Sequence, residues 1–180
     1  VAGFDIKREA MPILYELREK THLTCHLSIL QEREAIYLAK LESPQSVIVR
    51  SWVGKHVQLH CSALGKALLA WKSEHEIDQI FPQEELPVFN AATPATRTAL
   101  KQLLVHTRAR GWAIDNGEEV PEVRCIAAPV RDAHGEVMAA ISLSGVNYQI
   151  PDSRVEELAI QVRAAGIALS RTLGYTGDFS

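Results

Sequence analysis

The chain has 180 residues, of which 47% are hydrophobic and 23% are charged, and its formal net charge is −3. This length suits one well-buried domain rather than two, and the composition excludes an intrinsically disordered chain. The acidic balance argues against direct binding to a nucleic-acid backbone, and no apolar run is long enough to span a membrane. Three widely spaced cysteines and the lack of a recognisable secretion signal predict a cytoplasmic protein.

The first half of the chain predicts a helix followed by strands. Apolar residues recur at helical spacing over 6–17, and the helix is expected to start or kink near Pro12. Apolar and polar residues alternate over 23–29, which predicts a half-buried strand, and 35–41 is expected to form its partner. A third strand is expected to begin at 47–49.

The second half predicts further helices and another group of strands. Ser62 is placed to cap one helix and Gly111 to end another, while Ser153 and Glu156 form a capping box for a last helix that ends at Gly174. The helices are expected over about 64–71, 74–81, 96–110 and 153–173, and the strands over 112–115, 125–131 and 136–144. Strands in antiparallel pairs, with helices before, between and after them, predict an α+β fold with helices packed on a sheet.

One predicted hairpin has two very different faces. The turn at 132–135 sets a register in which Cys125 faces Ser142, and both then share a face with Ala140 and Ser144. The opposite face is apolar throughout. Small residues and hydroxyls beside a thiol would suit a compact polar ligand, whereas the alternative is that the two serines simply face water.

The segment that leads into the helix near residue 63 is a second candidate site. The first backbone N–H groups of that helix, at about 63–65, have no partner within the helix and could receive a carboxylate. The alternative is that Ser62 caps them and nothing else binds. The neighbouring His60 and Cys61 show no metal-ligand spacing, and the sequence does not tell whether they could meet as a catalytic pair.

Seven short segments, taken in chain order, carry a resemblance to a known family. They resemble the effector-binding domain of IclR-type bacterial transcription regulators, and the resemblance extends over about 6–175. The segments are THLT (21–24), YLAKLESP (37–44), VGK (53–55), HCSALGKALLA (60–70), RGWAID (110–115), VRCIAAPV (123–130) and ISLSG (141–145).

The resemblance implies a GAF-like fold, in which an antiparallel sheet backs a pocket for a small metabolite. It implies one effector-binding domain over 1–180, with 1–5 left from a linker to a winged helix-turn-helix domain that the sequence lacks. DNA would be contacted only through that absent domain. The family also implies assembly as a homodimer or homotetramer, without enzymatic activity, cofactor or metal.

Carried over position by position, the resemblance implies a site for a small carboxylate effector. Effector contacts fall on the backbone amides of Ala63 and Leu64 and on the side chains of Asp115, Cys125, Ser142 and Ser144. Pocket lining is expected at Val49, Val57, Val123 and Ala140. Residues that differ from the usual family pattern border this pocket, so the identity of the effector does not transfer. They are Gln58, Cys61, Leu64 and Glu122.

Two other interpretations remain open at the level of the sequence. A GAF-like fold can host redox chemistry, in which Cys61 and Cys125 would act as a catalytic thiol and its resolving partner. The domain could also be a pure oligomerisation module whose cavity is vestigial.

Overall fold

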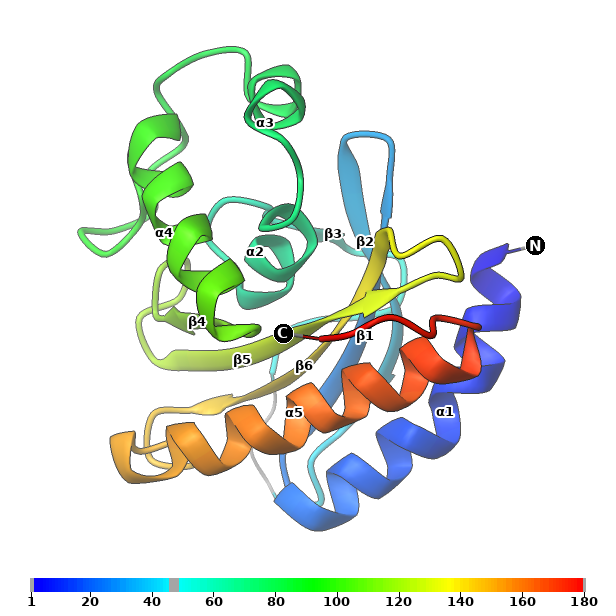
Figure 1. Ribbon diagram of the computed structural model, residues 1–180. Coiled ribbons are helices and arrows are strands. Elements are labelled where there is room, and N and C mark those ends of the chain that lie inside the picture. The colour runs from blue at the N-terminus through cyan, green and yellow to red at the C-terminus, as the bar shows by residue number, and fades with distance from the viewer. Residues whose placement is uncertain (1, 46–48, 180) are drawn as a thin grey trace.

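A six-stranded antiparallel sheet forms the centre of the molecule (Figure 1). The computed structural model describes residues 2–45 and 49–179. The strands are β1 (Thr24–Gln31), β2 (Glu34–Leu41), β3 (His56–Val57), β4 (Ala113–Asn116), β5 (Val123–Arg131) and β6 (Val137–Val146), and their order across the sheet is β3-β2-β1-β6-β5-β4. The first and last parts of the chain thus meet at the β1–β6 pair in the middle of the sheet.

Helices cover both faces of this sheet (Figure 1), which confirms the predicted α+β fold. Two long helices lie on one face, and three shorter ones lie over the other. The first group is α1 (Ala2–Thr21) and α5 (Asp152–Thr172), and the second is α2 (Ala63–Leu69), α3 (Glu74–Ile80) and α4 (Arg97–Arg110). Over the described ranges, none of these helices has the length and apolar character that a membrane crossing requires.

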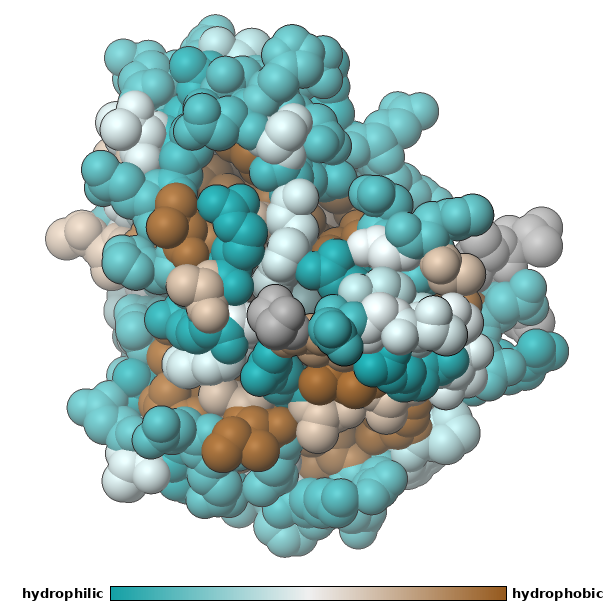
Figure 2. Space-filling model, viewed as in Figure 1, coloured by the Kyte–Doolittle hydropathy of each residue, from teal (hydrophilic) through white to brown (hydrophobic). Residues whose placement is uncertain are grey.

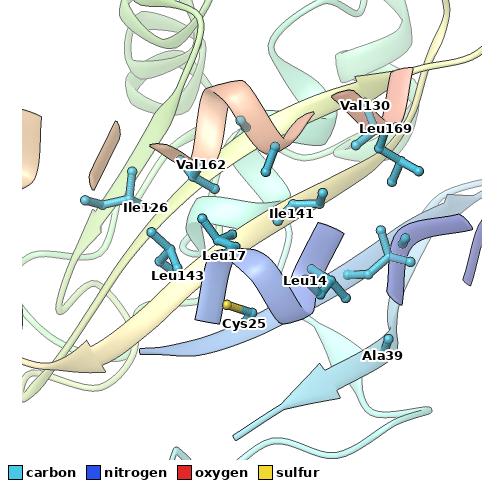
Figure 3. Packing of buried hydrophobic residues seen from close by; sticks show 14 of the residues in the cluster. Leu14, Leu17, Cys25, Ala39, Ile126, Val130, Ile141, Leu143, Val162 and Leu169 are labelled. Atoms are coloured by element: carbon cyan, nitrogen blue, oxygen red, sulfur yellow. The ribbon is translucent and has the colours of Figure 1, made fainter. Parts of the chain in front are cut away.

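The larger hydrophobic core lies between the sheet and the two long helices. Figure 3 shows Leu14 of α1 and Val162 and Leu169 of α5 beside Ile141 of β6, and all four side chains are buried. A second buried cluster lies under α2 and α4 on the other face. Because both faces are covered, residues 24–29 of β1 are all buried, and the prediction of a half-buried strand is wrong on its polar side.

Local signals predicted most helix ends correctly. The Ser62 hydroxyl accepts a hydrogen bond from the Gly65 N–H at 2.9 Å and caps α2. Gly111 ends α4 with φ of 83°, a left-handed conformation that glycine adopts without the strain a Cβ would cause. Gly174, with φ of 97°, follows the end of α5 as predicted. These helix ends depend on contacts between residues only a few positions apart, so they can be predicted from the local sequence.

Three local predictions differ from the structure. Helix α1 begins at Ala2, four residues before the predicted apolar run, and it continues through Pro12. The expected strand at 47–49 falls partly outside the described residues, and Val49 lies in no strand; β3 forms further along the chain. The capping box does not form either.

The start of α5 shows why the capping box failed. Its N-cap residue is Pro151, which has no side-chain hydrogen-bond acceptor, and the helix starts one residue before Ser153. The carboxylate of Asp152, in the first turn, lies 2.8 Å from the guanidinium of Arg124. A negative charge at this end of a helix is favourable because it faces the positive end of the helix dipole.

The β5–β6 register differs by two residues from the predicted one. Cys125 pairs with Ser144 rather than with Ser142. The turn occupies 132–136, one residue more than predicted, and a bulge at Met138 inserts another. Beyond the bulge the shift is an even number of residues, so the side chains from Ala139 onward stay on their predicted faces. The bulge itself exchanges the faces of its two residues: Val137 packs against the cluster under α2, contrary to the prediction, and Met138 packs against the larger core.

Candidate functional site

Neighbouring strands carry polar residues side by side on the sheet face beneath α2. Asp115 of β4 pairs with Cys125 of β5, and Cys125 pairs with Ser144 of β6. On the other side of β6, Ser142 pairs with His26 of β1. Directly paired residues project from the same face of a sheet. The sheet therefore brings together the four predicted contact side chains and adds one histidine, and we call these five residues the polar cluster.

Hydrogen-bonding distances connect four of the five members of the polar cluster, all except Asp115. The Cys125 thiol lies 3.1 Å from the Ser144 hydroxyl. Nδ1 of His26 lies 3.4 Å from the Ser144 Oγ and 3.5 Å from the Ser142 Oγ. Ser142 and Ser144 are only 1% and 3% exposed, so the alternative in which they face water is wrong.

His26 connects the polar cluster to a loop that crosses the sheet. Its Nε2 lies 2.6 Å from the Ser51 hydroxyl, and its ring lies 4.7 Å from that of Tyr37. Burial lowers the pKa of His26 to about 3, with smaller contributions from Lys40 and Lys55. His26 is therefore neutral, and one ring nitrogen donates a hydrogen bond while the other accepts one.

Asp115 is the acidic member of the polar cluster and is only 5% exposed. Burial raises its pKa to about 7, although the N–H of Glu118 donates to its Oδ1 at 2.7 Å and opposes the shift. The carboxylates of Glu118 and Glu119 raise this pKa further, and the ammonium of Lys66 lowers it. Near neutral pH this carboxyl is thus partly protonated and can donate as well as accept a hydrogen bond.

The N-terminus of α2 packs close to the polar cluster. Ala63 and Leu64 belong to the same buried cluster as Ala127 and Ala140, and Cys125 packs against it. In the part of the chain that the structure describes, neither the N–H of Ala63 nor that of Leu64 donates to another protein group. The helix entry and the polar residues predicted from separate segments therefore meet in one region.

A buried ion pair ties α2 to the loop that follows β4. The ammonium of Lys66 lies 2.5 Å from Oε2 of Glu118 and also donates to the carbonyl of Ile114. Oε1 of Glu118 is buried without a hydrogen-bond partner among the described residues. Separating the two partners would leave each as an uncompensated buried charge, which is strongly unfavourable. The pair therefore holds the loop against α2.

The predicted lining residues divide into two groups. Val57 and Ala140 are buried in the cluster under α2, and Val123 starts β5 on the same side as Cys125. Val49 instead lies on the loop before β3, where its carbonyl accepts a hydrogen bond from the Lys40 ammonium at 2.7 Å. The contact of the Val49 side chain with an effector stays a prediction.

The sequence patterns did not point to His26, Tyr37 or Ser51 as site residues. The signal for the histidine was present, because Thr24, His26 and Ser28 alternate with apolar residues and form a polar row. That row was interpreted as the solvent side of β1. Its pairing with β6, which buries the row against the two serines, is not visible in the sequence.

The two thiols of the redox alternative are in unfavourable surroundings. Burial raises the pKa of Cys61 to about 12, and burial also raises the pKa of Cys125 well above its usual range. Both are protonated at neutral pH, and the thiol is a poor nucleophile compared with the thiolate. Redox catalysis by this pair therefore has no support. Among the described residues, no three His, Cys, Asp or Glu side chains are grouped to hold a metal ion.

Comparison with known proteins gives a consistent result. XynR of Escherichia coli, an HTH-type transcriptional regulator, is 38% identical over 175 residues, which cover 97% of this chain and 69% of XynR. The C-terminal domain of the E. coli transcriptional regulator KdgR superposes with a TM-score of 0.85 at 32% identity, covering 95% of this chain and 99% of that one. An IclR homologue from Microbacterium hydrocarbonoxydans, solved in complex with 4-hydroxybenzoate, has the same fold, with a TM-score of 0.85 at 22% identity over 96% of this chain and 70% of that one.

The family itself is shown by a direct match. The model of the bacterial transcriptional regulator IclR C-terminal domain matches residues 1–171, nearly the whole chain. The helix entry at Ala63 and the hairpin with its two serines are features that the sequence motifs predicted. The chain belongs to the IclR family of bacterial transcriptional regulators and corresponds to the C-terminal domain of that family.

Proposed function

We propose that this domain senses a small carboxylate metabolite and passes the signal to a DNA-binding domain. The observation that carries the proposal is the polar cluster, a set of hydrogen-bonding groups buried beneath α2. These groups now contact one another, and a ligand with several oxygens could exchange these contacts for its own without leaving a buried polar group unpaired. In relatives such as XynR the regulator is of the HTH type, and DNA binding would belong to such a domain and act in the cytoplasm.

The chemistry of the site supports an anionic ligand with further oxygens. The amides of Ala63 and Leu64 would receive the carboxylate, with the ammonium of Lys66 nearby as a positive charge. Ser142 and Ser144 would donate to the remaining oxygens. Each neutral hydrogen bond adds about 0.5–1.5 kcal/mol, so affinities of about micromolar or weaker are expected.

Asp115 makes the proposed site sensitive to protons. A carboxylate placed close to it would raise its pKa further, because like charges disfavour ionisation. In its protonated form Asp115 could donate to a hydroxyl or oxo group of the ligand. On this proposal, binding near pH 7 takes up a fraction of a proton.

Cys125 adds a thiol to the proposed site. Its side chain is partly accessible, although the paired Ser144 is buried and burial dominates the rise in the pKa of the thiol. A protonated thiol in this position could donate a weak hydrogen bond to a ligand oxygen.

His26 would connect ligand binding to the outside of the domain. If the hydroxyls of Ser142 and Ser144 donate hydrogen bonds to a ligand carboxylate, they no longer donate to Nδ1 of His26. The neutral ring then exchanges its donor and acceptor nitrogens, which changes its bond with Ser51 on the loop before β3. Regulation further requires the effector to prefer one state of the protein, since equal affinity for two states shifts nothing.

The experiment that tests the site is a binding screen with serine variants. The 180-residue chain is screened by thermal shift against 2-oxo, hydroxy and aromatic carboxylates, 4-hydroxybenzoate included, and hits are titrated by calorimetry. We expect Ser142→Ala and Ser144→Ala each to weaken binding by about threefold to tenfold, the worth of one neutral hydrogen bond. Ser170→Ala is the control, because Ser170 is a buried serine of α5 outside the polar cluster.

Two results would contradict the proposal. A ligand that binds tightly and is indifferent to the Ser142, Ser144 and Asp115 variants would place the effector elsewhere. A domain that assembles normally but responds to no carboxylate would favour the pure oligomerisation module.

The proposal includes assembly with a second copy through the α1–α5 face. A groove of about 340 Å³ between these helices is lined mainly by apolar side chains, among them Ile13, Leu17 and Ala168. Ile160, at its edge, is 67% exposed, and Figure 2 shows hydrophobic residues gathered over these helices. Exposed apolar patches of this kind mark interaction surfaces.

Charge substitution at the groove tests this assembly. We expect Ile160→Glu to reduce the mass of the particle in light scattering to that of a smaller assembly, because a buried carboxylate without a partner is strongly unfavourable. Glu157→Gln, a nearby change on the same helix outside the groove, should leave the mass unchanged. An unaltered mass for both variants would assign the interface to another face.

A further inference from the structure

A second charged cavity lies at the opposite end of β5, where α4, α5 and the C-terminal segment meet. Three arginines line it, and each comes from a different element: Arg108 from α4, Arg131 from β5 and Arg163 from α5. Trp71, Phe179 and several small or aliphatic residues form the rest of its wall. We call this cavity the arginine pocket. Figure 1 shows the C-terminal segment running back from α5 toward the end of α4.

The three positive charges of the arginine pocket have no negative partner among the residues that the structure describes. None of the three guanidinium groups lies within 4.0 Å of a described carboxylate, whereas several other arginines form such pairs. Each guanidinium is instead fixed by one backbone carbonyl. Arg108 donates to the carbonyl of Ala70, Arg131 to that of Gly135, and Arg163 to that of Phe179.

Arg131 is the most constrained of the three. Its guanidinium lies over the rings of Trp71 and Tyr175, at 5.2 and 5.8 Å from their centres. Its Nε is buried and has no hydrogen-bond partner within the described ranges. The aromatic rings fix the plane of the group, while its N–H donors are only partly used. Buried donors of a charged group are rarely left unpaired, so this N–H is available to an acceptor from a water or a ligand.

Arg163 reaches the pocket because of a glycine. A Cβ on Gly111 would lie 2.8 Å from Nε of Arg163, so any other residue there would displace the guanidinium. The same glycine ends α4 in a left-handed conformation. Helix termination and the approach of the arginine thus depend on one position.

The size and charge of the arginine pocket indicate the group that fits it. The cavity is about 30 Å³, and one water needs about 10–15 Å³ of such space, so only a single small head group can enter. Arginine forks bind oxyanions through paired N–H donors. Donors that converge from three elements complement a tetrahedral group with several oxygens and two negative charges better than a flat carboxylate.

We propose that the arginine pocket binds a phosphate group, either inorganic phosphate or the head of a phosphate monoester. This site is separate from the carboxylate site proposed above. Arg131 and Cys125 lie six residues apart on β5, which corresponds to about 20 Å along a strand. A phosphate there would contact β5, α4 and α5 at once and would tie the C-terminal segment to the sheet.

The test measures the binding of inorganic phosphate to the 180-residue chain by calorimetry and by thermal shift at constant ionic strength. Wild-type protein should show saturable binding. Arg131→Gln and Arg163→Gln should each weaken it by about tenfold or more, the worth of one charged hydrogen bond. Arg131→Lys, which keeps the charge and loses the fork, should lie between. Each variant is compared with its own phosphate-free melting temperature, so a loss of stability is not counted as a loss of binding.

Control variants make the outcome decisive. Arg110→Gln removes the same charge from the same helix as Arg108, but Arg110 stacks on Trp112 outside the pocket, and the phosphate affinity of this variant should be unchanged. Ser144→Ala should also leave phosphate binding unchanged. The proposal is overturned if phosphate binds no better than chloride, if Arg110→Gln weakens it as much as Arg131→Gln does, or if only Ser144→Ala removes it. The last result would place phosphate in the carboxylate site.

Discussion

Replacing Asp115 with asparagine should raise the free energy of unfolding at pH 7 by on the order of 4 kcal/mol, since one pKa unit is worth about 1.4 kcal/mol. Burial raises the pKa of this carboxyl from 3.8 to about 7, so the native state keeps a proton that the unfolded state releases. The asparagine side chain is neutral at every pH, and its amide oxygen can still accept the N–H of Glu118.

The pH dependence of this difference has a definite sign. Below about pH 4 both states of the wild-type protein carry the proton, and the contribution of Asp115 to stability is complete. Between about pH 4 and pH 7 the unfolded state binds fewer protons than the native state, so stability falls as the pH rises and then levels off. Denaturant titrations at several pH values should therefore show the two proteins converging near about pH 4.

A half-buried aspartate in a turn provides the control for this experiment. Asp132 also accepts backbone N–H groups, from His134 and Glu136, but it lies in the exposed β5–β6 turn. Asp132→Asn should give no gain in stability at about pH 7. If Asp115→Asn destabilised the domain equally at all pH values, Asp115 would be ionised in the native state, and the proton-coupled part of the effector proposal would fall with it.

Gly65→Ala should lower the free energy of unfolding by about 3 kcal/mol, within the range of overpacking substitutions, and abolish effector binding. A Cβ at this position would overlap the carbonyl oxygen of Leu59 and lie 2.5 Å from its Cα, and backbone atoms cannot move aside as the end of a side chain can. Alanine has a higher helix propensity than glycine by about 1 kcal/mol, which would stabilise α2. A net loss of stability would therefore show that the clash with Leu59 outweighs this gain. The expected mechanism is displacement of α2 from the sheet, which would remove the amides of Ala63 and Leu64 from the site.

A second glycine on the sheet shows the contrast. A Cβ on Gly145 would lie 2.8 Å from Oε1 of Gln149, a buried side-chain atom that accepts a hydrogen bond from the N–H of Val146 at 3.0 Å. Relieving this contact would strain one side-chain hydrogen bond, whereas at Gly65 the backbone itself would have to move. Gly145→Ala should thus cost clearly less than Gly65→Ala, as measured by denaturant titration of both variants. Equal losses would mean that the approach of α2 to Leu59 is not the critical contact.

The candidate site was predictable where its signals are local. Ser62 begins α2 through a contact three residues away, and Gly111 ends α4 through its own backbone conformation. The shared face of Cys125, Ser142 and Ser144 follows from the alternation of side chains along a strand, which survives any even shift in register. The resemblance to the family placed Asp115 and the helix-entry amides in the same site, and the structure places them on neighbouring elements.

The pairing of distant segments could not be predicted in the same way. The true β5–β6 register depends on a bulge at Met138, whose cost or gain is set by packing of both strands against the helices. The capping box at Ser153 lost to a helix start one residue earlier, where Asp152 meets Arg124 of β5. In both cases a contact between remote residues outweighed a local preference.

By itself the sequence determined the type of most elements, the faces of the hairpin and the family, because each depends on short-range periodicity or on motifs. Only the tertiary structure decided that β1 lies against β6, which buries His26 beside the two serines and makes it neutral. It also decided that three arginines from separate elements meet without a described acid. The physical reason is that burial and charge proximity arise when segments far apart in the chain pack together, and no local pattern encodes the free energy of that packing.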